Sequence, residues 1–553
     1  MKVANILLFG SWMLASIAAA AAVDETATFE VKDGYREPKN IAFMVMSGGA
    51  SHTNWVLAFM QELSANRGHK TYFITRDDHV KFGHSFPSVD TVSIGPTYEF
   101  DEKKIDIIKK MRERPMMESF IDMFSSFNQE FGLDYTSIIN TLTSKKIDLA
   151  ICDHFCTPCV EASTKLKIPF IITSGMALGP DAGAPYINNN ILTISEPSTL
   201  NMSLWQRFDA MFIKPAQFIY KLRPFAKQQR ALYTSLGIED PVNVPEDRWK
   251  DSLKIVNSAF GFELARPLGP LVELVGPITT TRAPALTSEL TQFMELHNKV
   301  AYVAFGQHVV VSPKDIQLLL TGLLEAYEAQ ELDGIIWATR GLEGDFPDTL
   351  TTASNTVYHI QSLFQGHGNK DIRFIQWAPQ IAILNHPSTS MFITHGGAGS
   401  LFESLNAGVP VVVFPFFGDQ PAAAKNAERS GFGMKLEHTE PQARATEIIR
   451  TVARDKDHHF RANVKRFQTL VQLNNKIGII KAATLVEEVL FTHRHGQLLH
   501  RRDVKRDMSL FKAYNLDLYA VVLAVLAASL VGLTQLVKTA LSNYHLKQKL
   551  KTH

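Results

Sequence analysis

Short apolar runs separated by amphipathic segments make up the first half of the chain. Five such runs are flanked by polar or turn-forming residues, at residues 41–46, 71–75, 147–152, 168–173 and 255–257. Runs of this length are typical of strands that are buried on both faces of a parallel sheet. Between the first two runs, Val56, Phe59, Met60 and Leu63 fall on one stripe of a predicted helix that ends before Gly68. This alternation of strands and helices predicts an α/β domain.

The same alternation begins again after a proline-rich stretch at residues 266–284, which predicts a linker between two domains. Apolar runs beyond the linker predict further strands, at residues 300–305, 334–339, 371–377, 391–394 and 409–415. Helices are expected at residues 315–327 and onward to about residue 491. These runs therefore predict a second α/β domain, whereas residues 174–250 are irregular and then aromatic and amphipathic.

Glycine and polar residues gather where the predicted strands of the second domain end. The turn at residues 395–400 follows one strand and opens a helix, so its glycines let backbone N–H groups approach a ligand closely. A helix N-terminus also carries partial positive charge, and the turn therefore predicts a phosphate or diphosphate site. Ser400 and Glu403 share one face of this helix, while Asp419 and Gln420 follow the next strand. In an open parallel sheet, ligands bind outside these carboxyl ends.

Residues 374–420 resemble the donor-binding signature of the UDP-dependent glycosyltransferases (glycosyltransferase family 1), which include animal glucuronosyltransferases and plant glucosyltransferases. The residues that match this signature are Trp377, Pro379, Gln380, Leu384, His386, Pro387, Phe392, Thr394, His395, Gly397, Ser400, Glu403, Gly408, Pro410, Pro415, Asp419 and Gln420. So many fixed residue types in one segment form a far more specific signal than a lone glycine loop. The resemblance covers most of residues 40–495.

The resemblance implies a GT-B architecture, in which two Rossmann-like, doubly wound domains face a cleft and the last helix crosses back onto the first domain. The predicted organisation is, in chain order, a signal peptide (1–22), an N-terminal acceptor-binding domain (23–275), a C-terminal UDP-sugar-binding domain (276–495), a juxtamembrane linker (496–515), a transmembrane helix (516–537) and a cytosolic tail (538–553). In the family, the aromatic region around Trp205 and Tyr220 helps to form the acceptor pocket and contacts the membrane; ordinary core helices are the alternative.

For the nucleoside end of the donor, the resemblance implies that Trp377 stacks on uracil and that Gln380 lies near the nucleoside. Glu403 is expected to bind the ribose hydroxyls, a chemistry that suits a carboxylate facing a diol. Taken without the resemblance, Trp377 could equally be a core residue.

For the diphosphate and the sugar, the resemblance implies five further residues. His395, Gly397 and Ser400 are expected to bind the diphosphate, and Asp419 and Gln420 the sugar hydroxyls.

Two positions near the expected diphosphate site differ from the residues that are usual in the family. Gly306 matches a phosphate-contacting loop that usually reads Gly-Ser, whereas Gln307 departs from that pattern. Gly399 stands where many relatives have Asn, so the sugar preference stays open.

His52 and Asp153 are the predicted catalytic residues. Each lies just after or at the end of a predicted strand, and together they match the family's catalytic histidine and its aspartate partner. A histidine accepts a proton near neutral pH, and a carboxylate on its other ring nitrogen orients the ring and stabilises the imidazolium. The alternatives are a structural histidine and an aspartate that caps a helix. His154, next in sequence, is expected to point elsewhere.

Both ends of the chain carry targeting signals. Lys2, an apolar run to Ala22 and small residues before it are typical of a cleaved secretory signal. Residues 516–537 are apolar and reach the ~20 residues that cross a ~30 Å hydrocarbon core as a helix. The dilysine-like end at residues 549–553 indicates retrieval to the endoplasmic reticulum. We therefore expect a single-pass type I membrane protein with its catalytic domains in the lumen.

The cysteine content limits the number of disulfide bonds that the chain can form. Cys152, Cys156 and Cys159 are the three cysteines in the sequence. Cys156 and Cys159 have the C-x-x-C spacing of a redox motif, and three thiols could in principle bind a metal. Buried thiols at a strand–helix junction are favoured instead, together with one local disulfide that an oxidising lumen would permit. The lumenal location would also make Asn201 available for glycosylation.

Composition narrows the list of partners. A net charge of +1 with 20% charged residues indicates no nucleic-acid partner. No metal or bound cofactor is expected, because His395 and the helix N-terminus can neutralise the diphosphate. The expected partners are a UDP-sugar, which is a co-substrate, a small lipophilic acceptor and the bilayer, and the resemblance also allows a homo-oligomer.

The sequence therefore predicts a membrane-anchored, inverting UDP-glycosyltransferase that transfers a hexose or hexuronic acid to a hydroxyl group. Two alternatives remain open: a UDP-sugar-binding partner subunit without turnover, and a nucleotide-sugar epimerase or hydrolase of the same fold.

Overall fold

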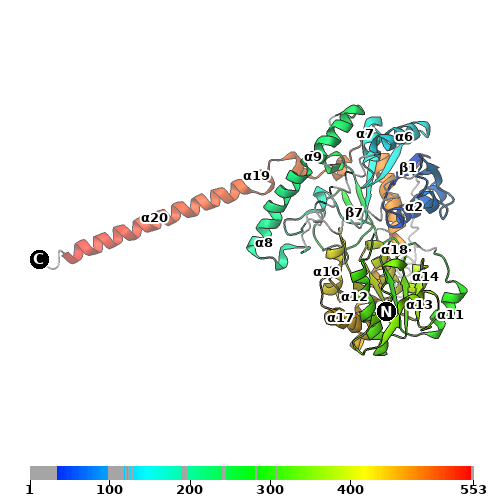
Figure 1. The fold of residues 1–553 in the computed structure, drawn as a ribbon. Helices are drawn as coiled ribbons and strands as arrows, with labels where there is room; N and C mark the ends of the chain where they lie inside the picture. Colours follow the sequence, from blue (N-terminus) through cyan, green and yellow to red (C-terminus); the bar gives the residue numbers. More distant parts are fainter. Residues whose placement is uncertain are drawn as a thin grey trace, which may run out of the picture. The chain divides into compact units, whose positions relative to one another are not determined.

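The computed structural model of the 553-residue chain describes residues 34–96, 118, 121, 125, 130–188, 196–239, 245–280, 283–306 and 309–549 (Figure 1). The predicted signal peptide, Gln307 and residues 550–553 of the tail lie outside these described residues. Residues 38–553 form one compact unit, which contains both sheets.

The first sheet has seven parallel strands in the order β3-β2-β1-β4-β5-β6-β7. Its strands are β1 (Asn40–Met44), β2 (Lys70–Thr75), β3 (Asp90–Ser93), β4 (Leu149–Asp153), β5 (Phe170–Ser174), β6 (Lys254–Val256) and β7 (Val272–Leu274). The predicted linker at residues 266–284 was too long at its start, because β7 lies inside it. Two short strands, β3 and β7, were missed because their half-exposed residues form no apolar run.

The second sheet has six parallel strands in the order β12-β9-β8-β13-β14-β15. Its strands are β8 (Val300–Ala304), β9 (Gly334–Ala338), β12 (Ile372–Ile375), β13 (Thr389–Thr394), β14 (Val411–Val413) and β15 (Gly433–Lys435). A separate antiparallel pair joins β10 (Thr349–Thr351) to β11 (Val357–His359). Both main sheets therefore have the doubly wound order, which confirms the predicted fold class.

The strand order fixes where ligands can bind. In each sheet the order reverses between two neighbouring strands, β1 and β4 in the first sheet and β8 and β13 in the second. Such a switch point leaves a crevice at the carboxyl ends of the strands, because the connections on its two sides run to opposite faces. The functional residues are therefore expected where β1, β4, β8 and β13 end.

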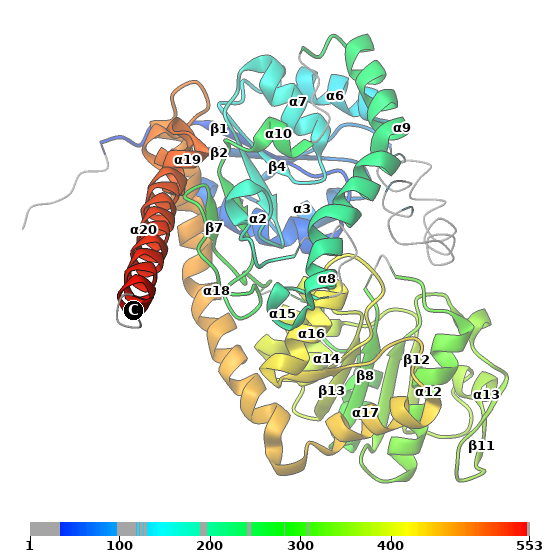
Figure 2. The same ribbon diagram turned by 90° about the vertical axis from the view of Figure 1, so that its left-hand side faces the viewer.

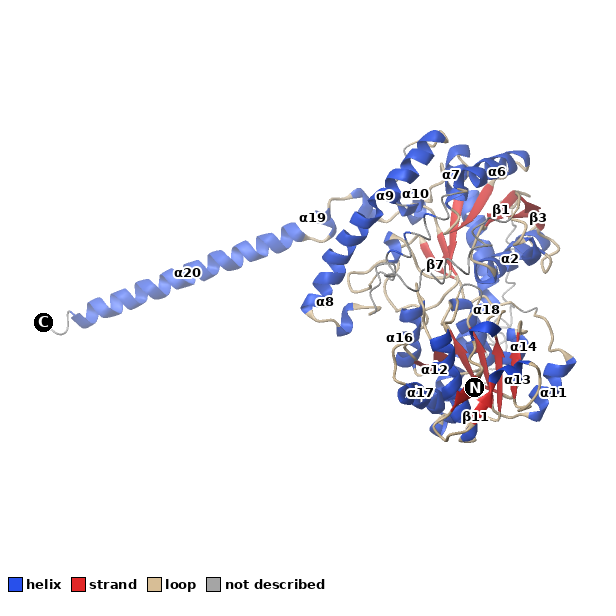
Figure 3. Cartoon of the chain, viewed as in Figure 1, coloured by secondary structure: helices blue, strands red, loops and turns tan. Residues whose placement is uncertain are grey.

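Helices cover both faces of each sheet (Figure 3). Around the first sheet they are α2 (Ala50–Ala65), α3 (Val80–Gly83), α6 (Phe131–Ser144), α7 (Thr157–Leu166), α8 (Leu204–Phe208), a π-helical turn (Asp209–Ile213), α9 (Lys214–Ser235) and α10 (Pro245–Trp249). Around the second they are α11 (Ser288–Leu296), α12 (Pro313–Glu328), α13 (Ile360–Phe364), α14 (Gln380–Asn385), α15 (Ala398–Ala407), α16 (Gln420–Ser430) and α17 (Gln442–Arg454). Short 3₁₀ turns lie at Pro180–Ala182, Thr199–Asn201, Glu343–Asp345, Lys456–His458, Leu499–Arg501 and Val504–Asp507.

Side-chain alternation along the buried strands explains why two cores flank each sheet. In β1, Ile41 and Phe43 pack into the core on one face, whereas Ala42 and Met44 pack into the core on the other. Successive side chains of a strand point to opposite faces, so a strand covered on both sides is apolar at every position. This is the pattern that made the strands recognisable in the sequence.

One long helix, α18 (His459–Thr492), connects the two domains (Figure 2). Val464 and Val471 near its start pack against the second sheet, and Val486 and Val489 near its end belong to the core of the first. Glu487 on the same helix forms a buried ion pair with Arg67 and accepts a hydrogen bond from His69. The helix therefore ties both sheets into one body.

After α18 the chain continues through α19 (Leu510–Ala513) into α20 (Leu516–Lys549). The stretch Leu516–Gln548 contains an 18-residue window with a mean hydropathy of 2.3, and none of this window is buried against the rest of the protein. A helix of this length and composition fits a transmembrane anchor.

We predict that Glu487→Ala lowers the free energy of unfolding by about 2 kcal/mol, because Arg67 and His69 lose their shared carboxylate on α18 while Arg67 keeps its ion pair with Glu62. The exposed pair Arg444–Glu447 is the control, and Glu447→Ala is expected to have no measurable effect. Denaturant unfolding of the detergent-solubilised variants measures both. Equal effects of the two substitutions would contradict the role of α18 as a tie between the domains.

Candidate active site

The predicted catalytic pair lies at the switch point of the first sheet. His52 is in the first turn of α2, directly after β1, and Asp153 is the last residue of β4. Because β1 and β4 are paired, with Met44 opposite Cys152, their carboxyl ends bring the two residues together. Residues that are 101 positions apart in sequence thus become neighbours.

The two side chains are joined by a hydrogen bond. Nδ1 of His52 lies 2.8 Å from Oδ2 of Asp153, and the other carboxylate oxygen accepts a hydrogen bond from the backbone N–H of Phe155 at 3.0 Å. The aspartate is 2% exposed and the histidine 19%, so only the histidine reaches the cavity. With Nδ1–H donated to the carboxylate, Nε2 is the ring nitrogen that is available to accept a proton.

The electrostatics of the pair follow from burial and proximity. Burial disfavours the charged imidazolium, but the adjacent Asp153 carboxylate outweighs this effect and raises the pKa of His52 above its usual value. Burial alone would raise the pKa of Asp153, yet His52 and His154 together hold it well below its usual range. Asp153 therefore stays ionised at neutral pH.

His154 does not point away from the site, contrary to the prediction. Its ring stacks on that of His52 with the centroids 5.2 Å apart, and its Nδ1 lies 3.7 Å from Asp153 and 3.3 Å from the carbonyl oxygen of Thr173. Neighbouring side chains point to opposite faces within a strand, but the strand ends at Asp153 and the chain turns there. His154 therefore belongs to the wall of the site.

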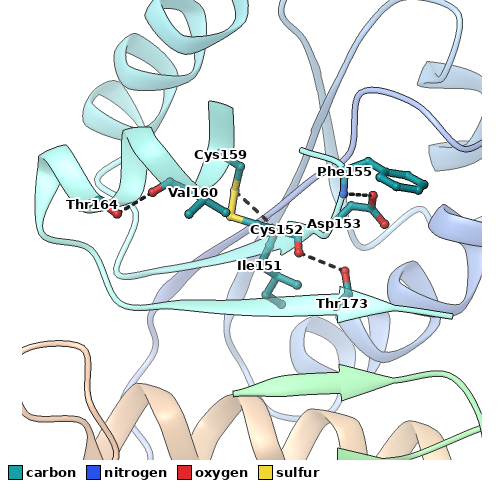
Figure 4. Close-up of a disulfide and its surroundings, with 8 residues drawn as sticks. All are labelled: Ile151, Cys152, Asp153, Phe155, Cys159, Val160, Thr164 and Thr173. Atoms are coloured by element: carbon teal, nitrogen blue, oxygen red, sulfur yellow. Dashed lines mark hydrogen bonds between the residues drawn. A yellow bond between two sulfur atoms is a disulfide. The ribbon is translucent and has the colours of Figure 1, made fainter. Parts of the chain in front are cut away.

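A disulfide bond closes the loop that carries Asp153 (Figure 4). It joins Cys152 at the end of β4 to Cys159 on α7, across a sequence separation of 7 residues, while Cys156 is a buried free thiol. The sequence left this pairing open, and the bonded residues are not the two with C-x-x-C spacing. The disulfide connects the strand that positions Asp153 to the helix that follows it.

The glycine turn of the second sheet lies at the carboxyl end of β13. It leads into α15, with Gly397 at the N-cap position, so the first N–H groups of this helix face the cavity. The ring of His395 packs between Gly306 and Gly397, and a Cβ on Gly397 would lie only 2.4 Å from its Nε2. Burial lowers the pKa of His395 to about 4, with the nearby Arg340 contributing, so the imidazole is neutral at neutral pH.

A polar network lies beside this turn, on α14 and α15. The side-chain amide of Gln380 donates to Glu403 at 2.6 Å and to Ser400 at 3.3 Å, and its carbonyl oxygen accepts from the Tyr302 hydroxyl at 3.4 Å. Burial raises the pKa of Glu403 to about 7. Sequence reasoning missed Tyr302 because an aromatic residue within a strand is indistinguishable from an ordinary core residue.

Three other predicted donor residues lie on the same cavity wall. Trp377 is 65% exposed, which excludes the alternative that it is a core residue. Asp419 precedes α16, and burial raises the pKa of its carboxyl group. Gln420 opens α16 and uses its side-chain oxygen to accept hydrogen bonds from the N–H groups of Phe416 and Phe417, which leaves its amide nitrogen for a ligand.

Arg340 is a cavity residue that the sequence analysis did not identify. It follows β9, and its guanidinium hydrogen-bonds to the carbonyl oxygen of Gly306. Burial lowers the pKa of Arg340, but it remains a cation at neutral pH. Its place at the carboxyl end of a predicted strand was the signal that could have identified it.

Both halves of the site open into one cavity of about 2270 Å³, which His52 and His154 line from the first domain and His395 and Asp419 from the second. The two domains approach closely here: a Cβ on Gly399 of α15 would lie 3.4 Å from Cβ of Ser51, the neighbour of His52. The Asp419 carboxylate also contributes to the raised pKa of His52. The cavity can therefore hold two substrates with their reacting groups next to His52.

Within the described residues, His52, Asp153 and His154 also form a group whose potential metal-ligating atoms lie within 4.8 Å of one another. The Nδ1 atom of His52 is engaged by Asp153, so a metal ion would compete with this hydrogen bond. That the reaction needs no metal and no bound cofactor stays a prediction.

Comparison with known proteins agrees with this geometry. Residues 44–551 match the family described as UDP-glucoronosyl and UDP-glucosyl transferase. A UDP-glycosyltransferase from Talaromyces amestolkiae is 30% identical over 401 residues, which cover 69% of this chain and 74% of that protein. UDP-glucuronosyltransferase 2B9 from Macaca fascicularis is 23% identical over 510 residues, which cover 87% and 90%, respectively.

Solved structures support the fold. The glycotransferase of kitacinnamycin aligns with a TM-score of 0.56 at 16% identity, over 82% of this chain and 100% of that one. The fold and the family match together define a glycosyltransferase that uses a UDP-sugar donor. The chain belongs to the UDP-glucoronosyl and UDP-glucosyl transferase family and is a transferase enzyme, as the sequence predicted.

We predict that the double variant Cys152→Ser, Cys159→Ser lowers the free energy of unfolding by about 2 kcal/mol, because the crosslink no longer restricts the unfolded chain. We also expect its turnover to fall several-fold, since the loop that carries Asp153 loses its tether. Unfolding and UDP release are measured with and without a reductant, and Cys156→Ala is the matched control. If a reductant slowed UDP release by the double variant as much as by the wild type, the effect of the reductant would not come from the Cys152–Cys159 disulfide.

Proposed function

We propose that this enzyme transfers a hexose or hexuronic acid from a UDP-sugar to a hydroxyl group of a small lipophilic acceptor, with inversion at the anomeric carbon. The observation that carries this proposal is the hydrogen-bonded pair His52–Asp153, which lies in the same cavity as the glycine turn of α15. A base and an anion-binding helix N-terminus in one cavity suit a displacement in which a phosphate is the leaving group.

In the proposed reaction, Nε2 of His52 takes the proton of the acceptor hydroxyl as its oxygen bonds to C1 of the sugar. The bond between C1 and the UDP oxygen breaks on the opposite face, and UDP leaves. Asp153 holds the ring in position and stabilises the imidazolium that forms, as its low pKa and its burial allow. Because a single displacement occurs, the configuration at C1 inverts.

The donor is proposed to lie along the second domain. Trp377, which is exposed on the cavity wall, suits stacking on uracil, and Glu403 with Gln380 suits the ribose hydroxyls. The first N–H groups of α15, His395 and Ser400 suit the diphosphate, and Arg340 adds a positive charge next to Gly306. Asp419 and the amide nitrogen of Gln420 suit the sugar hydroxyls.

The acceptor is proposed to lie along the first domain. Aromatic and aliphatic side chains dominate that side of the cavity, among them Phe82, Phe155, Leu178, Phe225 and Trp249. Such a wall favours an apolar molecule, because burying its surface removes it from water.

A location in the membrane of the endoplasmic reticulum, with the catalytic domains in the lumen, is also proposed. The apolar helix α20 supports the anchor, and the Cys152–Cys159 disulfide suits an oxidising compartment. Asn201 is exposed at the start of a glycosylation sequon, as a lumenal glycosylation site would require.

Acceptor-dependent release of UDP by the detergent-solubilised protein tests the proposal, with UDP-glucose and UDP-glucuronate offered separately against phenols, sterols and lipid alcohols. We expect turnover with one donor class and a loss of about 10²–10⁴-fold in His52→Ala, since the general base is removed. His367→Ala, which removes an exposed histidine, is the control and should not change the rate. Undiminished turnover in His52→Ala would overturn the catalytic assignment, and donor binding without turnover on any acceptor would favour a binding subunit.

A further inference from the structure

The segment between α18 and the apolar helix α20 is docked on the first domain. Leu498 is 5% exposed and belongs to the core of the first sheet. Arg501 lies between two carboxylates, 2.8 Å from Glu488 on α18 and 2.8 Å from Glu273 on β7. An arginine that two carboxylates share is held more firmly than one in a single exposed ion pair. Residues 498–507, which lead to the proposed membrane anchor, are therefore part of the folded domain.

A second arginine of this segment also lies between two carboxylates. Arg506, in the 3₁₀ turn Val504–Asp507, forms ion pairs with Asp251 and with Asp181, and the distance from its guanidinium to Oδ1 of Asp181 is 3.4 Å. The Asp251 side chain is 43% exposed, whereas that of Asp181 is only 11% exposed. Oδ2 of Asp181 is buried without a hydrogen-bond partner among the residues that the structure describes. Burying a carboxylate costs free energy unless a cation compensates it, so Asp181 depends on a neighbour such as Arg506.

Asp181 belongs to a turn that shapes one wall of the cavity. It lies in the 3₁₀ turn Pro180–Ala182, which follows the carboxyl end of β5. Neither Asp181 nor Arg506 lines the cavity, whereas the residues around Asp181 do: Leu178, Gly179, Ala182 and Gly183. This wall is on the side where the acceptor is proposed to bind. Arg506 therefore supports the wall through a residue that the acceptor does not touch.

Gly179 brings the same wall into contact with Trp249 and Lys254. Its φ of +87° is a conformation that favours glycine, and a Cβ here would lie 3.1 Å from the Trp249 ring and 3.5 Å from Cε of Lys254. Lys254 is 1% exposed, and burial lowers its pKa to about 8, while Asp181 opposes this decrease and Arg506 adds to it. Arg506, Asp181 and Lys254 therefore interact electrostatically as one group next to the wall.

The turn has backbone contacts that do not involve Arg506. The N–H of Gly269 donates to the carbonyl oxygen of Asp181 at 2.7 Å, and Arg266 donates to that of Ala182 at 2.7 Å. These contacts keep the turn folded when Arg506 is replaced. The expected consequence is therefore a small displacement of the lining residues rather than unfolding, and dispersion contacts with a bound molecule weaken steeply with such displacements.

We propose that Arg506 is a positioning residue for the acceptor, which acts by holding Asp181 and thereby fixes the cavity wall at residues 178–183. The segment that leads to the membrane anchor is thus coupled to acceptor binding. This inference rests on the proposed function, because it takes this wall as the acceptor side. The proposed donor residues Trp377, Glu403 and Asp419 belong to the second domain, so the UDP-sugar is not expected to respond.

Steady-state kinetics of the full-length, detergent-solubilised protein with hydroxybiphenyl as the acceptor test the proposal. We expect Arg506→Ala to raise KM for the acceptor by about fivefold, with kcat and KM for the UDP-sugar unchanged. Asp181→Asn should have the same effect, and the double variant should be no worse than either single one, because both changes remove one interaction. Arg506→Lys should recover most of the loss, since an ammonium group still pairs with Asp181.

The matched control is Arg502→Ala, which removes another arginine of the same segment. Arg502 pairs with Asp507, and both side chains are exposed, so this variant should keep the wild-type constants. If Asp181→Asn does not fold, the comparison of Arg506→Ala with Arg506→Lys and with the control still decides the question.

The outcomes separate the two levels of the argument. An unchanged KM for the acceptor in Arg506→Ala, equal increases in KM for donor and acceptor, or additive effects of the two substitutions would overturn the role of Arg506 but not the transfer reaction. If no acceptor is turned over, the proposed function fails, and calorimetric Kd values for hydroxybiphenyl and for UDP then decide the inference. Weaker binding of hydroxybiphenyl alone in Arg506→Ala would support it, and equal changes in both Kd values, or none, would overturn it.

Discussion

The hydrogen bond between His52 and Asp153 is the interaction on which the proposed chemistry depends. A neutral imidazole in a buried site would ordinarily lose basicity, because the surroundings disfavour its charged form. Asp153 reverses that effect and raises the pKa of His52. The pairing of β1 with β4, the backbone N–H of Phe155 and the nearby disulfide all fix this carboxylate. These three features of the first domain therefore hold the Asp153 carboxylate next to His52.

The second constraint is that the proposed base and the proposed donor site lie on different domains. Helix α18 packs on both sheets, and Gly399 permits α15 to approach the first turn of α2, which carries His52. Polar contacts cross the cavity as well, since Lys425 on α16 pairs with Glu196 and Asn426 donates to the carbonyl oxygen of Gly261. These contacts hold the two domains together around one cavity, so the donor and the acceptor of the proposed reaction would lie next to each other. Such proximity contributes to the rate.

The sequence predicted both sheets and the residues at their switch points because those features leave local signals. Buried parallel strands such as β1 and β8 are apolar at every position, and the turn at His395 has a fixed glycine pattern. The sequence could not reveal features that depend on tertiary contacts. The inward orientation of His154, the partner of Cys152 and the contact between Arg340 and Gly306 all arise from residues that are distant in the chain or from the way a strand ends. The short strands β3 and β7 escaped prediction for a local reason, since half-exposed strands carry no apolar run.

The most direct test of the central claim is the pH dependence of kcat/KM for the acceptor at saturating UDP-sugar, in the wild type and in Asp153→Asn. The imidazolium cannot accept a proton, so wild-type activity should rise with pH through the pKa of His52, which Asp153 holds above the usual value for a histidine. In Asp153→Asn the opposing effect of burial remains, so the rise should move to lower pH, with a maximal rate that is lower by about 10⁴-fold. A rise at the same pH in both proteins would contradict the assignment of His52 and Asp153 as the catalytic pair.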